Sequence, residues 1–304
     1  MSEEGVGTIE IEDKRYPKAL RDALKNLVAS SGPKKLYYKG AFDEEIFKNC
    51  LAVVGSRHLT SYGRRVTEQL VTEIAASGVT IVSGFMYGGD EAAHSATVRC
   101  GGRTIAVMPC GIGRIHPESQ KELYKKILEN NGLILSEYEG DIQPQTFTYI
   151  QRDRIVAGLS KAVLVTEAAL NSGSLITANY AKKYGRKVFA VPGQITSELA
   201  KGTMKLIKEG AEPVMEANDI LSFYKVLVSQ KSGSPSSANS QSIAGSDPAT
   251  TLEQKIISQL KREPMKADDM ARALCIPVAQ IGTALSLMQL RGFINQDSGK
   301  YYLN

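Results

Sequence analysis

Six short apolar runs alternate with helical patterns along the first two thirds of the chain. Each run is too short for a typical helix and most are rich in β-branched residues, so each predicts a buried strand. Regular alternation of strands and helices predicts an α/β fold, namely a doubly wound, mostly parallel, Rossmann-like sheet. The runs are LAVVG (51–55), VTIVSG (79–84), RTIAVMP (103–109), GLILSE (132–137), KAVLVTE (161–167) and KVFAVPG (187–193).

The segment between the first two runs carries a helical signature. Val66, Leu70 and Ile74 recur at i, i+4 and i+8, and Thr60 or Ser61 stands before them as a candidate N-cap. This spacing puts the three apolar side chains on one face. We therefore expect a helix that lies on the sheet.

The last quarter of the chain differs in composition. Residues 232–250 contain seven Ser, one acidic residue and no basic residue, which is typical of a flexible linker. Three short helical patterns and two strand patterns follow, and this order suggests a winged helix. The predicted parts are a short helical segment (1–40), a Rossmann-like domain (41–228), a Ser-rich linker (229–250) and a winged helix (251–304).

Composition limits the cellular setting. The N-terminal residues MSEEGVGTIEIEDKRYP are acidic and polar, and no apolar run approaches the roughly 18 residues of a membrane helix. The four Cys are scattered, and neither they nor the three His have metal-ligand spacing. We expect a cytoplasmic protein with no membrane partner, disulfide or metal. The net charge of +5 fits a polyanion partner or simply a mildly basic surface.

The turn after the first run has the chemistry of an anion site. Gly55 allows close approach to the backbone, Ser56 offers a hydroxyl, and the Arg57 guanidinium matches a phosphate. A tight turn with a solvent-exposed arginine is the alternative. The turn lacks the G-x-G-x-x-G pattern of dinucleotide sites, and no G-K-[ST] of a Walker A loop occurs. No nucleotide cofactor is expected.

Two later segments add candidates. The turn NSGSLITANYA (171–181) crowds Ser172, Gly173, Ser174 and Thr177 at a helix start, like a second phosphate cradle. The segment FTYIQRDRIVAGLS (147–160) interleaves aromatic residues with arginines, which suits single-stranded nucleic acid because bases stack and phosphates pair. The alternative is a helix N-terminus with arginines on the surface and aromatic residues in the core, which would give the same sequence pattern.

Asp90 and His94 lie four residues apart at a predicted helix start. They could form an acid/base pair. The favoured interpretation is that Asp90 complements the helix N-terminus while His94 packs behind it.

The ordered motifs resemble the bacterial DNA-processing protein A (DprA/Smf) family of recombination mediators. The resemblance runs from about Leu51 to Leu221 and also covers a winged helix after a linker. It implies a Rossmann-like domain that binds single-stranded DNA, forms a homodimer and loads the RecA recombinase in natural transformation, without catalytic turnover. The matching motifs are VGSR-x-x-T-x-Y-G, SG-x-x-x-G-x-D-x-x-AH, LSEY, R-x-R-I-V-AGLS, SGSLITA, VFAVPG and KGT-x-x-LI-x-EGA.

By matching positions, the resemblance implies a set of DNA-contacting residues. The family commonly has a basic residue, Gly and Ile where this chain has Tyr87, Gly88 and Gly89; it has Asn at Asp153 and at Met204. The implied nucleic-acid-binding residues are Gly55, Ser56, Arg57, Tyr149, Arg152, Arg154, Ser172, Gly173, Ser174 and Thr177.

Two alternatives stay open. The chain could be a Rossmann-like nucleotide phosphoribohydrolase with Glu167 as its acid, although TEAALNSGSLITA stands where those enzymes have P-G-G-x-G-T-x-x-E. The winged helix could bind duplex DNA, but its second half offers only Gln280, Gln289 and Arg291 to a groove, so docking to a protein fits equally well.

Overall fold

The computed structural model describes residues 5–25, 32–225, 251–261, 263–274, 276–297 and 299–303. By its internal contacts the chain divides into two compact units, Met1–Gln230 and Lys231–Asn304. The linker predicted at residues 229–250 lies outside the described residues.

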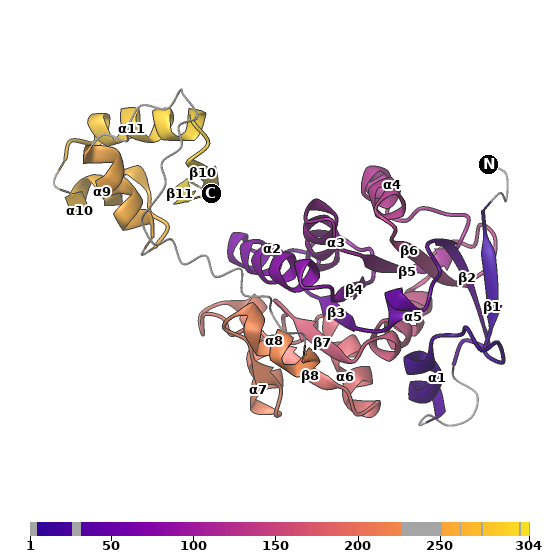
Figure 1. Cartoon of the computed structure of the whole chain (residues 1–304). Helices are drawn as coiled ribbons and strands as arrows, with labels where there is room; N and C mark the ends of the chain where they lie inside the picture. The colour runs from indigo at the N-terminus through magenta and orange to yellow at the C-terminus, as the bar shows by residue number, and fades with distance from the viewer. Residues whose placement is uncertain are drawn as a thin grey trace. The chain divides into compact units, whose positions relative to one another are not determined.

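The first unit is built on one nine-stranded sheet with the order β1-β2-β6-β5-β4-β3-β7-β8-β9 (Figure 1). In this order, the strands from β6 across to β9 run parallel to one another. Strand β1 pairs antiparallel with β2, and β2 pairs antiparallel with β6. The prediction of a mostly parallel, doubly wound sheet is confirmed. The strands are β1 (Gly7–Glu10), β2 (Lys35–Gly40), β3 (Cys50–Val54), β4 (Thr80–Ser83), β5 (Thr104–Gly111), β6 (Leu133–Tyr138), β7 (Ala162–Val165), β8 (Lys187–Ala190) and β9 (Glu212–Pro213).

Helices cover both faces of this sheet. The buried side chains of α1, α5 and α6 share one hydrophobic cluster, and those of α2, α3 and α8 share another. The helices of this unit are α1 (Lys18–Lys25), α2 (Ser61–Ala76), α3 (Gly89–Arg99), α4 (Lys121–Glu129), α5 (Thr146–Leu159), α6 (Ser174–Lys183), α7 (Lys201–Lys208) and α8 (Ala217–Tyr224).

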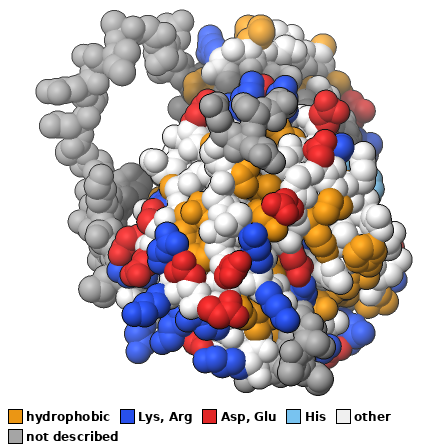
Figure 2. All heavy atoms as spheres, turned by 90° about the vertical axis from the view of Figure 1, so that its right-hand side faces the viewer, with side chains coloured by type: hydrophobic (Ala, Val, Ile, Leu, Met, Phe, Trp, Pro, Cys, Tyr) orange, Lys and Arg blue, Asp and Glu red, His pale blue; other side chains and the backbone are white. Residues whose placement is uncertain are grey.

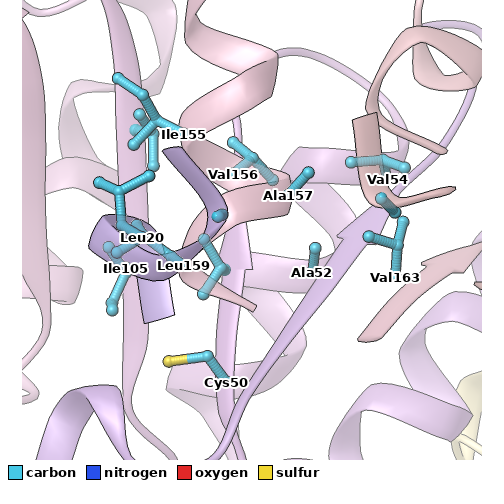
Figure 3. Close-up of a cluster of buried hydrophobic side chains, with 14 of the residues drawn as sticks. Leu20, Cys50, Ala52, Val54, Ile105, Ile155, Val156, Ala157, Leu159 and Val163 are labelled. Atoms are coloured by element: carbon cyan, nitrogen blue, oxygen red, sulfur yellow. The ribbon is translucent and has the colours of Figure 1, made fainter. Parts of the chain in front are cut away.

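Strand β3 shows why the sequence reads as continuous apolar runs. Ala52 and Val54 belong to one core cluster, whereas Leu51 and Val53 belong to the cluster on the opposite face. Successive side chains of a strand point to opposite faces, so a strand covered on both sides must be apolar at every position. Figure 3 shows Ala52, Val54 and Val163 beside side chains from α5.

Helix α2 confirms the predicted amphipathic helix and its cap. Thr60 is the N-cap, and its Oγ1 accepts a hydrogen bond from the Gly63 N–H at 3.0 Å. The Glu167 carboxylate, which follows β7, accepts a bond from the Thr60 N–H at 2.9 Å and another from its hydroxyl at 2.6 Å. A carboxylate next to the helix N-terminus also complements the helix dipole.

The prediction for residues 1–40 needs correction. The helix α1 is present, but β1 and β2 flank it, and β2 pairs with β6 so that both strands extend the sheet. The short run KLYYKG (35–40) carried the β-prone residues Leu36, Tyr37 and Tyr38, a signal that the helical interpretation overlooked.

The second unit has the element order of a winged helix. Helices α9 (Thr251–Leu260), α10 (Ala267–Leu274) and α11 (Val278–Leu290) precede the antiparallel pair β10 (Ile294–Asp297) and β11 (Lys300–Leu303). Ile256, Met270, Leu285 and Ile294 are fully buried and tie all three helices to β10. The predicted winged helix is confirmed.

No single helix in the described part of the chain is long and apolar enough to cross a membrane. The pair α10 and α11 meets the length and composition criteria only when taken together, across a bend of 118°.

Candidate nucleic-acid interface

The strand order places a crevice between β3 and β7. The chain winds outward in one direction from β3 through β4, β5 and β6, and in the other from β7 through β8 and β9. In open α/β sheets, ligands bind beyond the carboxyl ends of the strands at such a reversal. A pocket of about 590 Å³ lies there, lined by the turn after β3, the turn after β4, one face of α5 and the start of α6.

The turn after β3 forms one wall and is packed tightly. The Ser56 hydroxyl accepts a hydrogen bond from the His58 N–H at 3.1 Å, so it stabilises the turn itself. A Cβ built on Gly55 would lie 2.8 Å from Thr166 Oγ1, and one on Gly89 would lie 2.6 Å from the Gly55 Cα. The absence of side chains therefore lets the start of α3 approach the turn.

Arg57 is the exposed cation of this wall. Its guanidinium lies 5.1 Å from the centroid of the Tyr149 ring, within the range of a cation–π contact. The Tyr149 hydroxyl is 2.7 Å from His116 Nε2, which fixes the ring from its other end. Because Arg57 has no ion pair with any described residue, the guanidinium is available to an anion.

Arg152 lines the same pocket but is committed to the protein. Its side chain is 5% exposed, and Nη1 donates to the Gly84 carbonyl oxygen and, at 2.8 Å, to that of Val107. Its Nε donates to Asp153 Oδ1 at 3.1 Å. This arginine therefore links the turn after β4 to the middle of β5, whereas the family resemblance implied a contact to DNA.

Two carboxyl groups lie beside Arg152 in the pocket. Asp90 accepts a hydrogen bond from the Met86 N–H at 3.3 Å, and burial raises the pKa of its carboxyl above the usual value. Burial likewise raises the pKa of Asp153 to about 6, against the attraction of Arg152. The carboxyl groups of Asp90 and Asp153 offset part of the charge of Arg57 and Arg152, and protonation of Asp153 makes the pocket more positive.

The raised pKa of Asp153 predicts a pH-dependent stability. The ordinary pKa of 3.8 rises to about 6 on folding, so the folded state favours the protonated form. Its stabilising contribution is complete below about pH 4 and is lost as pH rises to about 6, a change of about 3 kcal/mol. Asp153→Asn removes this pH dependence, so its free energy of unfolding relative to wild type should be about 3 kcal/mol higher at about pH 8 than near pH 4, on top of a constant effect of removing the partner of Arg152. Circular dichroism of the full chain measures this; an equal gain at both pH values would contradict the raised pKa.

The opposite wall belongs to the start of α6. Ser172 and Ser174 share a hydrogen bond of 2.8 Å between their hydroxyls, and Ser174 and Thr177 are buried. A Cβ on Gly173 would meet no atom within 4 Å, so this residue faces open space. The structure thus brings all four predicted residues of this turn to the pocket.

Arg154 requires a correction, because it does not line the pocket. It is buried, and its Nη2 lies 2.7 Å from both carboxylate oxygens of Glu137. Residues i and i+2 of a helix point in nearly opposite directions, so Arg152 and Arg154 cannot serve one pocket. Arg154 joins α5 to β6 instead.

The favoured interpretation of Asp90 and His94 agrees with the structure. His94 is buried and its Nδ1 lies 2.7 Å from Thr104 Oγ1, while burial lowers the pKa of its ring to about 3. The two residues therefore do not act as an acid/base pair. Among the described residues, no group of three His, Cys, Asp or Glu could hold a metal ion.

Several lining residues were missed by the sequence reasoning. Thr146 and Ile150 share one face of α5 with Tyr149 and Asp153, as helical spacing could have indicated. Tyr87 was not missed, since the resemblance already put it beside the pocket; it is 46% exposed and comes from the turn after β4. Its place in the pocket follows from the parallel order of β3 and β4.

Glu167, the acid of the alternative enzyme hypothesis, has a structural role. It is 5% exposed, and both of its carboxylate oxygens accept hydrogen bonds from Thr60. It does not line the pocket. A carboxylate held in this way is poorly placed to transfer a proton to a bound nucleotide.

The surface charge outside the pocket is mixed. Figure 2 shows acidic and basic side chains interspersed on the face that carries β1. A net charge of +5 therefore does not appear there as a continuous basic surface.

The chain matches known families over nearly its whole length. Residues 7–225 match the family model described as DNA recombination-mediator protein A, and residues 241–300 match the DprA winged helix domain. Protein Smf of a Synechocystis species is 32% identical over 96% of this chain and 78% of its own length. DNA processing protein DprA of Bacillus subtilis is 37% identical over 72% of this chain and 71% of its own length.

Solved structures agree with these sequence matches. The X-ray structure of DNA processing protein A from Streptococcus pneumoniae superposes with a TM-score of 0.65 at 38% identity, covering 72% of this chain and 74% of that one. A structure of DNA processing protein A from Helicobacter pylori, described by its single-stranded DNA binding mode, superposes with a TM-score of 0.63 at 30% identity. It covers 74% of this chain and 98% of that one. The matched sequence, the doubly wound sheet and the winged helix together establish that this chain belongs to the DNA recombination-mediator protein A (DprA/Smf) family.

Proposed function

We propose that this chain binds single-stranded DNA in the pocket between β3 and β7 and acts as a recombination mediator. The observation that carries the proposal is the Arg57–Tyr149 pair at the pocket wall, which offers an unpaired guanidinium beside an aromatic ring. A phosphate pairs with the first, and a base stacks beside the second.

The pocket walls add dipoles of the right sign. The N-terminal residues of α5 and α6, Thr146 and Ser174, both line the pocket, and the positive ends of helix dipoles favour anions. The proposed DNA-contacting residues are Gly55, Ser56, Arg57, Tyr149, Ser172, Gly173, Ser174 and Thr177. Arg152 acts indirectly, by holding the pocket together.

Partners and setting extend the proposal. The relatives from Bacillus subtilis and Streptococcus pneumoniae are named DNA processing proteins, and a structure of the Helicobacter pylori protein is described by its single-stranded DNA binding. From the resemblance of the sequence motifs to the family, we further propose that this chain loads the RecA recombinase onto strands taken up in transformation, works as a cytoplasmic homodimer, and performs no catalytic turnover.

Fluorescence anisotropy of a labelled single strand tests the proposal. We expect the full chain to bind the single strand more tightly than a duplex of equal length, because only unpaired bases can stack on side chains. Affinity should fall with salt with a slope of about −0.7 per neutralised phosphate. Equal binding to single strand and duplex, or no binding, would contradict the proposal.

A further inference from the structure

The lining of the pocket includes the carboxyl group of Asp153, which repels a phosphate when it is ionised. Asp153 lies one helical turn after Tyr149 on the face of α5 that lines the pocket. Asp90 lies in the same cavity. An ionised Asp153 repels a DNA backbone, so we expect the phosphate to stay on the Arg57 side and another part of the nucleotide to meet Asp153.

One of the two carboxylate oxygens of Asp153 accepts no hydrogen bond from the described residues. Oδ1 accepts the hydrogen bond of Arg152 Nε at 3.1 Å, whereas Oδ2 receives no donor from the described residues. An ionised carboxylate is an acceptor only, so it needs a ligand that donates. Asp90 is less available, because it already accepts from the Met86 N–H and its carboxyl is buried.

The aromatic and cationic side chains that line the pocket around Asp153 suit a nucleobase. A base that stacks beside Tyr149 and the Arg57 guanidinium directs its edge into the interior of the cavity, where Asp153 lies. The cavity of about 590 Å³ is within the range of small-ligand sites. The exposed ring of Tyr87 adds a second aromatic surface on the wall formed by the turn after β4.

We propose that this pocket takes an unpaired nucleobase and that Asp153 selects bases bearing an exocyclic amino group. Cytosine, adenine and guanine each carry such a donor. Thymine and uracil have no exocyclic donor, and their one edge donor, the ring N3–H, is flanked by two carbonyl oxygens whose lone pairs meet those of the carboxylate. The inference rests on the proposed binding of single-stranded DNA and specifies which part of the nucleotide enters the site.

The test compares oligo-deoxycytidine with oligo-deoxyuridine of equal length, since the two bases differ at the exocyclic group and N3 but not in ring size. At about pH 8, above the pKa of Asp153 of about 6, anisotropy should show about tenfold tighter binding of the cytosine strand. Asp153→Asn, whose amide both donates and accepts, should bind the two strands within about twofold of each other.

Asp141→Asn is the matched control. Its carboxylate is exposed, does not line the pocket, and carries the same charge as Asp153. This variant should keep the wild-type preference even if both affinities rise. Equal wild-type affinities for the two strands, or a preference that persists in Asp153→Asn, would overturn the inference while leaving single-strand binding intact. Binding of neither strand would instead overturn the proposed function, and the inference with it.

Discussion

Arg152→Ala is expected to lower the free energy of unfolding by about 3–5 kcal/mol, the usual cost of removing one partner of a buried ion pair. The guanidinium is 5% exposed and bonds to Asp153 and to two carbonyl oxygens, those of Gly84 and Val107. Its loss removes this donor from all three acceptors and leaves Arg57 as the cation that still acts on the carboxyl groups of Asp153 and Asp90.

Urea unfolding followed by circular dichroism measures the effect. Arg57→Ala is the control, because an exposed side chain at the pocket mouth should change stability by no more than about 0.5 kcal/mol. Arg152→Ala combined with Asp153→Asn should recover part of the loss, since the unpaired charge is then absent. If Arg152→Ala unfolds at the same urea concentration as wild type, the guanidinium is not the support described above.

A loss of DNA binding in an Arg152 variant has two possible physical causes, a lost contact and a damaged pocket. The side chain holds the turn after β4 to β5 and α5 from within the pocket. A variant that loses DNA affinity here can do so because the pocket collapses, so Arg152 alone cannot identify a phosphate contact.

Arg57→Ala is expected to weaken single-strand binding about tenfold or more. The change removes a charge-assisted hydrogen bond to a phosphate, worth about 1.5–3 kcal/mol, and uncovers the Tyr149 ring. The salt dependence should become less steep by about 0.7 in the logarithmic slope, because one fewer counterion contact is made. Anisotropy across a salt series measures both quantities.

Two further variants separate charge from shape. Arg57→Lys should keep the salt slope of wild type but bind more weakly, because an ammonium has no flat face to stack with Tyr149 or a base. Arg99→Ala removes an exposed arginine outside the pocket that pairs with Glu68, and should change affinity little. If Arg99→Ala weakens binding as much as Arg57→Ala, the DNA follows general surface charge and not the pocket.

Much of the site follows from the sheet, and the sheet could be predicted from the sequence. A run such as KAVLVTE at 161–167 can be recognised as a strand in the sequence, because a strand buried on both faces is apolar at every position. The turns after β3 and β7 then meet at one edge, since the carboxyl ends of neighbouring parallel strands do. The family resemblance implied that Arg57 and Ser172, which are far apart in sequence, serve one DNA pocket, and the structure places both in one pocket.

The errors came from interactions that one segment cannot reveal. Residues 35–40 became a strand because β6 offers a free edge to pair with, and that pairing spans about a hundred residues. The N-terminal part therefore completes the sheet, contrary to the expectation of a helical segment.

Sequence alone determined the doubly wound sheet, the capped helix α2, the winged helix and the two glycine-serine turns, because each depends on local propensity and periodicity. Only the tertiary structure decided the roles of the charged side chains. Arg152, Asp153 and Arg154 are consecutive on α5. Arg152 lines the pocket and binds the carbonyl oxygens of Gly84 and Val107, Asp153 lines the same pocket with an oxygen that has no donor from the described residues, and Arg154 pairs with Glu137 outside it. Helix geometry sends neighbouring side chains in different directions, and what each one meets depends on strands brought close only by folding.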